Sequence, residues 1–187
     1  MKKVLTFITV GMFLVAGVTM VYAAEKASQK VVDLANTALA NLGTDPVIVK
    51  AIKAENAKGK TLAQIKDMDK KWKAHAGIAG YMQAMMDSES GKHLRNIQES
   101  ASFYAEIFVM DNQGANVAMT DKTSDYWQGD EAKFKKSFAN GAGAVFVDEV
   151  EFDDSTQAYL VQVSVPVKDG SKVIGAITFG IDVDKIE

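Results

Sequence analysis

Two aromatic residues beside an acid form the segment best suited to holding a small molecule. Tyr126 and Trp127 stand together between Asp125 and Gln128, in a stretch rich in turn-forming residues. Flat aromatic faces stack on a ligand or hold a cation over the ring. The structural alternative is that Trp127 fills the core of the domain while Asp130 caps the helix that follows.

A dense acidic stretch provides the second group of candidate residues. It contains Asp148, Glu149, Glu151, Asp153 and Asp154. Because successive side chains of a strand point to opposite faces, only alternate members can share a site, and Asp148 is the member expected to point inward. The spacing matches no calcium-binding loop, so a solvated acidic hairpin is the alternative interpretation.

No catalytic or metal-binding motif is recognisable in the sequence. There is no cysteine and no GxSxG, HExxH or phosphate-loop pattern. The histidines, His75 and His93, lack the spacing of a zinc site and are expected at the surface or in packing. Met82, Met85 and Met86 are expected to fill gaps between helix and sheet rather than to bind copper. We therefore predict a protein that is not an enzyme and uses no cofactor or metal.

The N-terminal residues have the composition of a secretion signal. Lys2 and Lys3 precede an apolar run over residues 4–21, and Val21 and Ala23 provide small residues before a cleavage point after residue 23. The alternative is an uncleaved inner-membrane anchor formed by residues 4–21. Both interpretations predict a periplasmic location, since the lysines hold the short N-terminus inside the cell.

Composition limits the size and the partners of the exported part. Beyond residue 23 the chain has 164 residues, enough for one domain with an ordinary core. That part carries 24 Asp and Glu against 19 Lys and Arg, a net charge of −5. An acidic chain of this kind is not expected to bind nucleic acid.

The first half of the exported chain has the pattern of helices. Residues 24–98 are rich in Ala, Lys, Gln and Met. The apolar residues that repeat with helical spacing before Gly43 are Val31, Leu34, Ala38 and Leu42. Further helices are predicted to start at Thr44–Pro46, at the capping box Thr61–Gln64, near Gly80 and at Ser88.

The second half alternates between strands and turns. Strands are predicted over residues 103–110, 115–120, 144–152, 158–167 and 172–182, with a short helix over 132–138. Residues 158–167 show the period-two alternation of a half-buried strand. This order predicts an α+β fold, with a five-stranded antiparallel sheet, a long N-terminal helix and further helices on one side. A cavity is expected beneath the connection between the second and third strands.

Three segments resemble the single Cache family of extracytoplasmic sensor domains, which are also described as PAS-like or PDC domains. Residues 107–114, 163–170 and 172–177 are similar to the first strand and turn, the fourth strand and the last strand of that family. We therefore predict a Cache sensor core over residues 99–187 that forms one domain with the helical region 24–98.

The resemblance implies a pocket for a small extracellular ligand. On this basis the predicted ligand-binding residues are Tyr104, Met119, Tyr126, Trp127, Phe146 and Asp148. Carboxylate receptors of the family use arginine or histidine on the second strand, where this chain has Asn116 and Met119. Amino-acid receptors hold an ammonium group with two acids, of which Asp148 matches one while Gly180 stands at the other position. These departures favour a less charged, amine-bearing or aromatic ligand.

The export signal and the resemblance together predict a periplasmic sensor module. It is expected to signal through a separate membrane partner, a sensor kinase or a chemoreceptor, and to form a homodimer through the N-terminal helix. The alternative is a non-catalytic periplasmic interaction or scaffold protein whose PAS-like core is filled by Trp127, Phe146 and Phe179. A third interpretation is an anchored receptor fragment that stops before its second membrane helix.

Overall fold

The structure, a computed structural model, describes residues 25–153 and 156–186. The predicted signal or anchor, residues 1–23, lies outside the described residues, as does Asp154 in the acidic stretch. Among the helices that are described, none combines the length and the apolar character needed to cross a bilayer.

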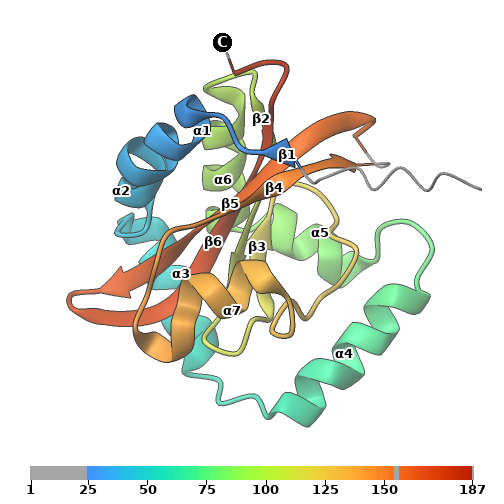
Figure 1. Cartoon of the computed structure of the whole chain (residues 1–187). Coiled ribbons are helices and arrows are strands. Elements are labelled where there is room, and N and C mark those ends of the chain that lie inside the picture. The colour runs from blue at the N-terminus through green and yellow to red at the C-terminus, as the bar shows by residue number, and fades with distance from the viewer. Residues whose placement is uncertain (1–24, 154–155, 187) are drawn as a thin grey trace, which may run out of the picture.

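Six antiparallel strands form one sheet in the order β1-β4-β5-β6-β2-β3 (Figure 1). The strands are β1 (Glu25–Lys26), β2 (Tyr104–Met110), β3 (Asn116–Met119), β4 (Phe146–Asp153), β5 (Ala158–Asp169) and β6 (Lys172–Asp182). The predicted α+β fold and its five strands are confirmed. The structure adds β1, a two-residue strand that pairs with the outer edge of β4.

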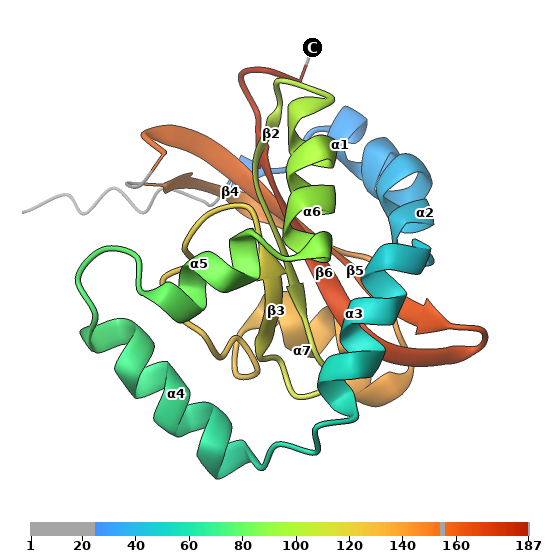
Figure 2. The ribbon, with the colours of Figure 1, turned by 180° about the vertical axis from the view of Figure 1, so that it is seen from behind.

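One face of the sheet is covered by the N-terminal helices and α6, which lie together in front of the sheet in Figure 2. The elements are α1 (Gln29–Leu34), α2 (Ala40–Leu42), α3 (Pro46–Asn56) and α6 (Glu89–Glu99). A π-helical turn, Ala35–Leu39, separates α1 from α2 within the predicted long helix. Val31, Ala35 and Leu39 are all fully buried in the core on this side. In a regular α-helix, residues four apart do not point in quite the same direction, so a row of them turns gradually away from the sheet. The wider π turn compensates for this rotation and keeps all three side chains on the side that faces the sheet.

Three of the predicted helix starts are confirmed by side-chain hydrogen bonds at their first turns, and the fourth is confirmed by the start of α5 at Gly80. The Asp45 carboxylate accepts from the first backbone N–H groups of α3. Thr61 and Gln64 form a reciprocal capping box at the start of α4 (Leu62–Ala74). The Ser88 hydroxyl accepts from the Gly91 N–H at the start of α6. These caps satisfy donors that the helices leave unpaired at their N-termini.

The second face of the sheet carries a smaller core under α4, α5 (Gly80–Met86) and α7 (Ala132–Phe138). Met82 and Met86 pack there, as predicted, with Phe108 of β2. The helix α4 stands away from the sheet in Figure 1 and reaches this core through Ile65 and Trp72. Helices therefore lie on both faces, an addition to the one-sided arrangement that the sequence predicts.

The central strands are buried on both faces, except at Gln162 of β5. Along β5, Val161, Val163 and Val165 are fully buried on one side and Ser164 on the other. Gln162 alone in this stretch is only half-buried. The predicted half-buried strand is thus a two-sided one, because helices pack against both of its faces. The opening at Gln162 marks the candidate site.

Candidate ligand-binding cleft

A cleft opens over the sheet between β4 and the loop that leads to α7. It consists of two adjoining hollows of about 340 Å³ and 410 Å³. Both are lined by Lys133, Asp153 and Gln162, so they adjoin at these three side chains. Its position is the one that the sequence predicts, beneath the connection between β3 and α7.

The floor of the cleft is a cross-strand row of Glu106, Gly180 and Gln162. Gly180 on β6 pairs with Glu106 on one side and with Gln162 on the other. The Gln162 amide donates to Glu106 Oε1 across the glycine, at 3.1 Å. A Cβ atom at position 180 would lie 2.7 Å from Glu106 Cγ. The missing side chain of Gly180 is therefore what lets the Glu106 carboxylate lie over the middle of the sheet.

The carboxyl group of Glu106 has an unusual environment for an acid. Burial raises its pKa above the ordinary value, and the nearby carboxylates of Asp153 and Asp121 raise it further. Lys133 and the hydrogen bond from Gln162 act in the opposite direction. The net raised pKa means that this carboxyl group holds its proton more strongly than an exposed glutamate, which is typical of functional sites.

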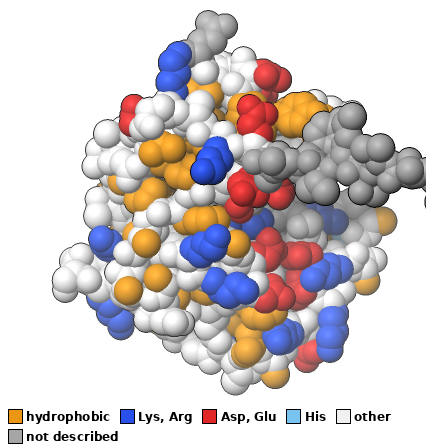
Figure 3. Space-filling view, viewed as in Figure 1, with side chains coloured by type: hydrophobic (Ala, Val, Ile, Leu, Met, Phe, Trp, Pro, Cys, Tyr) orange, Lys and Arg blue, Asp and Glu red, His pale blue; other side chains and the backbone are white. Residues whose placement is uncertain are grey.

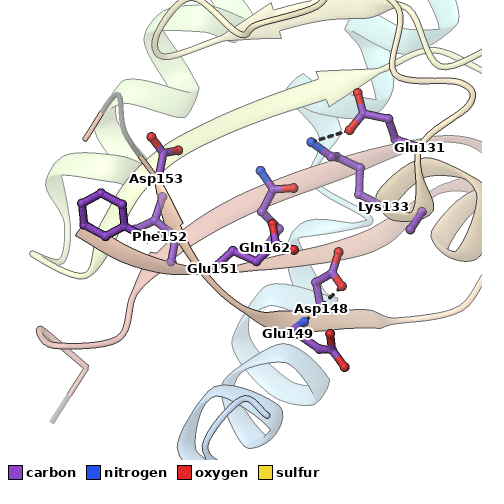
Figure 4. A pocket seen from close by; sticks show the side chains of 10 residues that line it. Glu131, Lys133, Asp148, Glu149, Glu151, Phe152, Asp153 and Gln162 are labelled. Atoms are coloured by element: carbon purple, nitrogen blue, oxygen red, sulfur yellow. Dashed lines mark hydrogen bonds and ion pairs between the residues drawn. The ribbon is translucent and has the colours of Figure 1, made fainter. Parts of the chain in front are cut away.

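A lysine from α7 lies in the wall of the cleft. Lys133 Nζ is 2.9 Å from Glu131 Oε2, and the Lys133 side chain is 13% exposed. Its ammonium group also lies 5.5 Å from the centre of the Phe108 ring. In Figure 4, Lys133 points toward Glu131, while Asp148 and Gln162 reach into the space between α7 and the sheet.

The roof of the cleft is the loop from Lys122 to Gln128, whose backbone is held by short hydrogen bonds. Asn116, Thr123 and Gln128 all donate to the carbonyl of Asp125, at 3.1, 2.7 and 2.8 Å. Three donors on one carbonyl fix the loop, and one of them, Asn116, comes from β3.

The roof is also tied to α4. Asp69 Oδ1 accepts from the N–H groups of Tyr126 and Trp127, at 2.9 and 3.1 Å. The Trp72 indole donates to the Thr123 carbonyl at 2.8 Å. The position of α4 and the position of the roof are therefore coupled.

The acidic stretch surrounds one side of the cleft. Asp148 is half-buried and lines the cleft, as predicted for the inward-pointing member. Glu149 and Glu151 are exposed but line the cleft as well, so the expectation that only alternate members share a site is wrong. A register shift in the pairing of β4 with β5, between Val147 and Val150, interrupts the regular alternation there. In Figure 3 acidic side chains gather in a hollow beside β4, with lysines around it. Within residues 25–153 and 156–186, no three acidic, histidine or cysteine side chains gather where a metal ion could be held.

The other predicted ligand-binding residues lie outside the lining of the two hollows. Met119 is buried in the core below the cleft, in the same cluster as Tyr126. Because of a β-bulge between Tyr104 and Glu106, these two side chains point to opposite faces of the sheet. Tyr104 packs on Phe179 at the face away from the cleft. Regular alternation along β2 would have placed Tyr104 on the cleft side.

Tyr126 and Trp127 serve different contacts in the roof. The Tyr126 hydroxyl accepts from Lys60 Nζ at 2.8 Å, and its ring is 2% exposed against Trp72. The Trp127 indole donates to the Gln113 carbonyl at 2.8 Å, so its half-buried ring covers the β2–β3 turn.

The structural alternative for this part of the chain is confirmed in one half and wrong in the other. Trp127 packs against the smaller core, but at its edge: its ring is half-buried beside Lys66, whose ammonium is 4.5 Å from the ring centre. Asp130 does not cap α7: the N-cap residue is Glu131, which makes no side-chain capping hydrogen bond. Phe146 lines a groove beside β1 with Lys136 over its ring, and Asp148 lines both that groove and the cleft.

The main cleft residues that the sequence did not single out are Glu106, Phe108, Gln128, Lys133 and Gln162. A signal for Glu106 exists, since it is the one charged residue in the apolar run 103–110. An acid inside an apolar strand is costly unless it has a partner or a function. Gln162 gives a similar signal among the valines of β5.

The known proteins that match this chain are solved structures. No family model matches the chain, and no curated protein does. A matching solved structure is the sensor domain of the Vibrio cholerae histidine kinase DctB, with 14% identity and a TM-score of 0.46, over 83% of this chain and 51% of that one.

Two chemoreceptor structures match over similar parts of the chain. They are the ligand-binding domain of Campylobacter jejuni Tlp3 in complex with 4-methylisoleucine (12% identity, TM-score 0.43, 85% of this chain and 62% of that one) and that of Pseudomonas aeruginosa PctC in complex with GABA (10% identity, TM-score 0.39, 80% and 60%). The chain thus spans about half to two thirds of the length of these proteins.

Proposed function

We propose that this chain is a periplasmic sensor module that binds a small molecule and signals through a separate membrane protein. The observation that carries the proposal is the open cleft on the central sheet, with the Glu106–Gln162 pair on its floor. A concave site with a few converging polar groups is the usual form of a small-molecule site. The predicted binding role of Asp148, which lines the cleft, belongs to this proposal.

Signalling requires that ligand binding change a second part of the molecule. The roof is hydrogen-bonded to α4 through Asp69 and Trp72, so a ligand that moves the roof also moves this helix. A ligand shifts such an equilibrium only by the difference in its affinity for the two states. We therefore place the contact with a sensor kinase or chemoreceptor partner on a surface that includes α4.

A homodimer through the N-terminal helix remains part of the proposal. The outward residues of this helix are polar and exposed, among them Lys30, Asp33, Asn36 and Thr37. A contact through such a surface would be polar and transient rather than obligate. Sedimentation velocity over a range of protein concentrations measures it, and a monomer at every concentration would remove this part.

Native mass spectrometry tests the proposal directly. The chain is expressed with its N-terminal residues, purified from the periplasm without denaturant, and its native mass is compared with its denatured mass. A small excess mass in the native spectrum identifies a captured ligand. The variant Ser124→Trp, which places a large side chain at the exposed mouth of the cleft, should lose that excess. The matched control Ser171→Trp, in the exposed β5–β6 turn, should keep it.

The alternative function is a periplasmic interaction or scaffold protein. An exposed aromatic pair favours it: Phe152 and Tyr159 are 49% and 52% exposed and meet edge to face at 5.2 Å on the β4–β5 hairpin. No excess mass, together with no stabilisation by any compound of a broad metabolite library in thermal unfolding, would favour this function over the sensor.

A further inference from the structure

The roof of the cleft contains a buried hydrogen-bond acceptor that the fold leaves unpaired. Gln128 is 1% exposed and lines the 410 Å³ hollow together with Glu106. Its Nε2 donates to the Asp125 carbonyl at 2.8 Å, which fixes the orientation of the amide. Among the described residues, Gln128 Oε1 has no hydrogen-bond partner. Less than 1 Å² of this oxygen is exposed, so a donor of a ligand reaches it when the roof shifts. A buried acceptor without a partner costs free energy, which favours that contact.

The charges around the cleft favour a cation. The acids that line it are Glu106, Glu131, Asp148, Glu149, Glu151 and Asp153. The lysines that line it each have a partner: Lys133 is paired with Glu131, Lys73 donates to two carboxylates, and Lys122 donates to a backbone carbonyl. An excess of carboxylates with low-dielectric walls attracts positive ligands and repels anions.

An apolar surface lies beside these acceptors. The Phe108 ring lines the same hollow as Glu106 and Gln128. The ammonium group of Lys133 already lies 5.5 Å from the centre of this ring. Aromatic faces attract ammonium groups and also cover hydrocarbon chains. The cleft therefore offers an acceptor pair and an apolar wall within one space.

We propose that the cleft binds an organic ammonium ion with an apolar body and no carboxylate, with Glu106 and Gln128 accepting hydrogen bonds from the ammonium group and Phe108 contacting the body. This inference rests on the proposed function, whose ligand class it specifies. Within the part of the chain that the structure describes, Glu106 accepts one side-chain hydrogen bond, from Gln162 to Oε1, which leaves Oε2 for the ligand. Arg95, the one arginine of the sequence, donates to the Thr120 carbonyl and does not line the cleft, so no guanidinium fork is placed to hold a carboxylate.

Three probes with one body and different head groups test the charge of the ligand. They are 2-phenylethylamine, 2-phenylethanol and 3-phenylpropanoate, titrated into the full chain by isothermal titration calorimetry. A charge-assisted hydrogen bond to a partly buried carboxylate predicts that the amine binds about tenfold or more tightly than the alcohol. The carboxylate should bind most weakly. Equal or tighter binding of the alcohol or the carboxylate would overturn the inference.

Two variants test the acceptors separately. Glu106→Gln keeps the size of the side chain but removes the charge, and should weaken amine binding about tenfold while leaving the affinity for 2-phenylethanol unchanged. Gln128→Met removes the acceptor oxygen, together with the Nε2 hydrogen bond to the Asp125 carbonyl, and leaves Glu106 in place; it should weaken amine binding several-fold. The control Asp67→Asn removes an exposed charge on α4 and should change neither affinity. Circular dichroism confirms that each variant is folded.

The outcomes separate this inference from the proposed function. If native mass spectrometry identifies an anionic or neutral captured ligand, the sensor proposal stands and the ammonium site is wrong. If amine binding is unchanged in both Glu106→Gln and Gln128→Met, the assigned acceptors are wrong. If no probe binds and no excess mass is found, both proposals fall.

Discussion

The two faces of the central sheet have opposite characters, although the same strands form both. On the face covered by α1–α3 and α6, the residues of β5 and β6 are apolar and fully buried, as with Val163 and Phe179. On the other face their neighbours are Gln162, Gly180 and a hydroxyl pair, Ser164 and Thr178, 2.7 Å apart. Alternation along these strands thus puts apolar side chains on the face of the larger core and the polar row of the cleft floor on the other.

The largest expected effect on stability is that of removing a large side chain from the face of the larger core. Phe179→Ala takes a fully buried ring from the larger core. We expect a loss of about 3–5 kcal/mol in the free energy of unfolding, because the cavity does not close. Gln162 is next to Val163, the residue that pairs with Phe179, but its side chain faces the cleft. Gln162→Ala should therefore lower the free energy of unfolding by less than about 1 kcal/mol. Urea unfolding followed by circular dichroism measures both, and equal losses would contradict the division of roles.

Cutting the tether between α4 and the roof should have the next largest effect. Asp69→Ala removes the acceptor for two backbone N–H groups, those of Tyr126 and Trp127. We expect a cost of about 2–4 kcal/mol, since each buried donor left unpaired costs on the order of 1–3 kcal/mol. Hydrogen exchange should show faster exchange of these two amides. A loss spread evenly over the whole chain would argue that α4 supports the fold and not the roof.

Adding a methyl group to the cleft floor should lower the free energy of unfolding by a smaller amount, and a second substitution at Glu106 should restore most of it. Gly180→Ala places a Cβ atom against Glu106 Cγ and displaces the carboxylate. We expect a loss of about 1–3 kcal/mol from overpacking. In the double variant Gly180→Ala/Glu106→Ala the contact is gone, so most of this loss should be recovered. A double-mutant cycle measures the coupling, and additive losses would mean that the two residues do not interact.

The smallest expected effect is a dependence of stability on pH that comes from Glu106. Because burial raises its pKa, the folded protein holds this proton more strongly than the unfolded chain does. Ionised Glu106 therefore lowers stability above its raised pKa, and protonation restores stability as the pH falls through that value. Glu106→Gln should melt at a higher temperature than the parent at neutral pH, and this gain should vanish at pH values below the ordinary glutamate range. A gain of the same size at every pH would contradict the raised pKa. The exposed Glu149→Gln is the control.

Much of the fold could be predicted because local signals set the element ends. The capping box Thr61–Gln64, the cap at Asp45 and the turn at Asp111–Gly114 are each complete within a few residues. Strand bounds also followed from apolar runs between turns. The missed features depend on distant partners: β1 exists only because the edge of β4 is there to pair with it.

The cleft was harder to predict than the fold because its floor joins strands that are far apart in the sequence. Glu106 and Gly180 become neighbours through the pairing of β2 with β6. The bulge beside Tyr104 then decides which side chains of β2 face the cleft, and the sequence gives no sign of it. Asp148 was predicted to point inward from the alternation of side chains along a strand and from its match to an acid of the receptors that the sequence resembles.

The hydrogen bonds of the two tryptophans give the molecule an optical reporter of its own. Trp72 and Trp127 are its only tryptophans, and each indole N–H is bonded to a backbone carbonyl, of Thr123 in the roof and of Gln113 in the β2–β3 turn. The emission of an indole depends on its hydrogen bonding and on its exposure to water. A rearrangement of the roof should therefore shift the intrinsic fluorescence spectrum. Binding in the cleft could then be followed in real time, without a label, by exciting the protein alone.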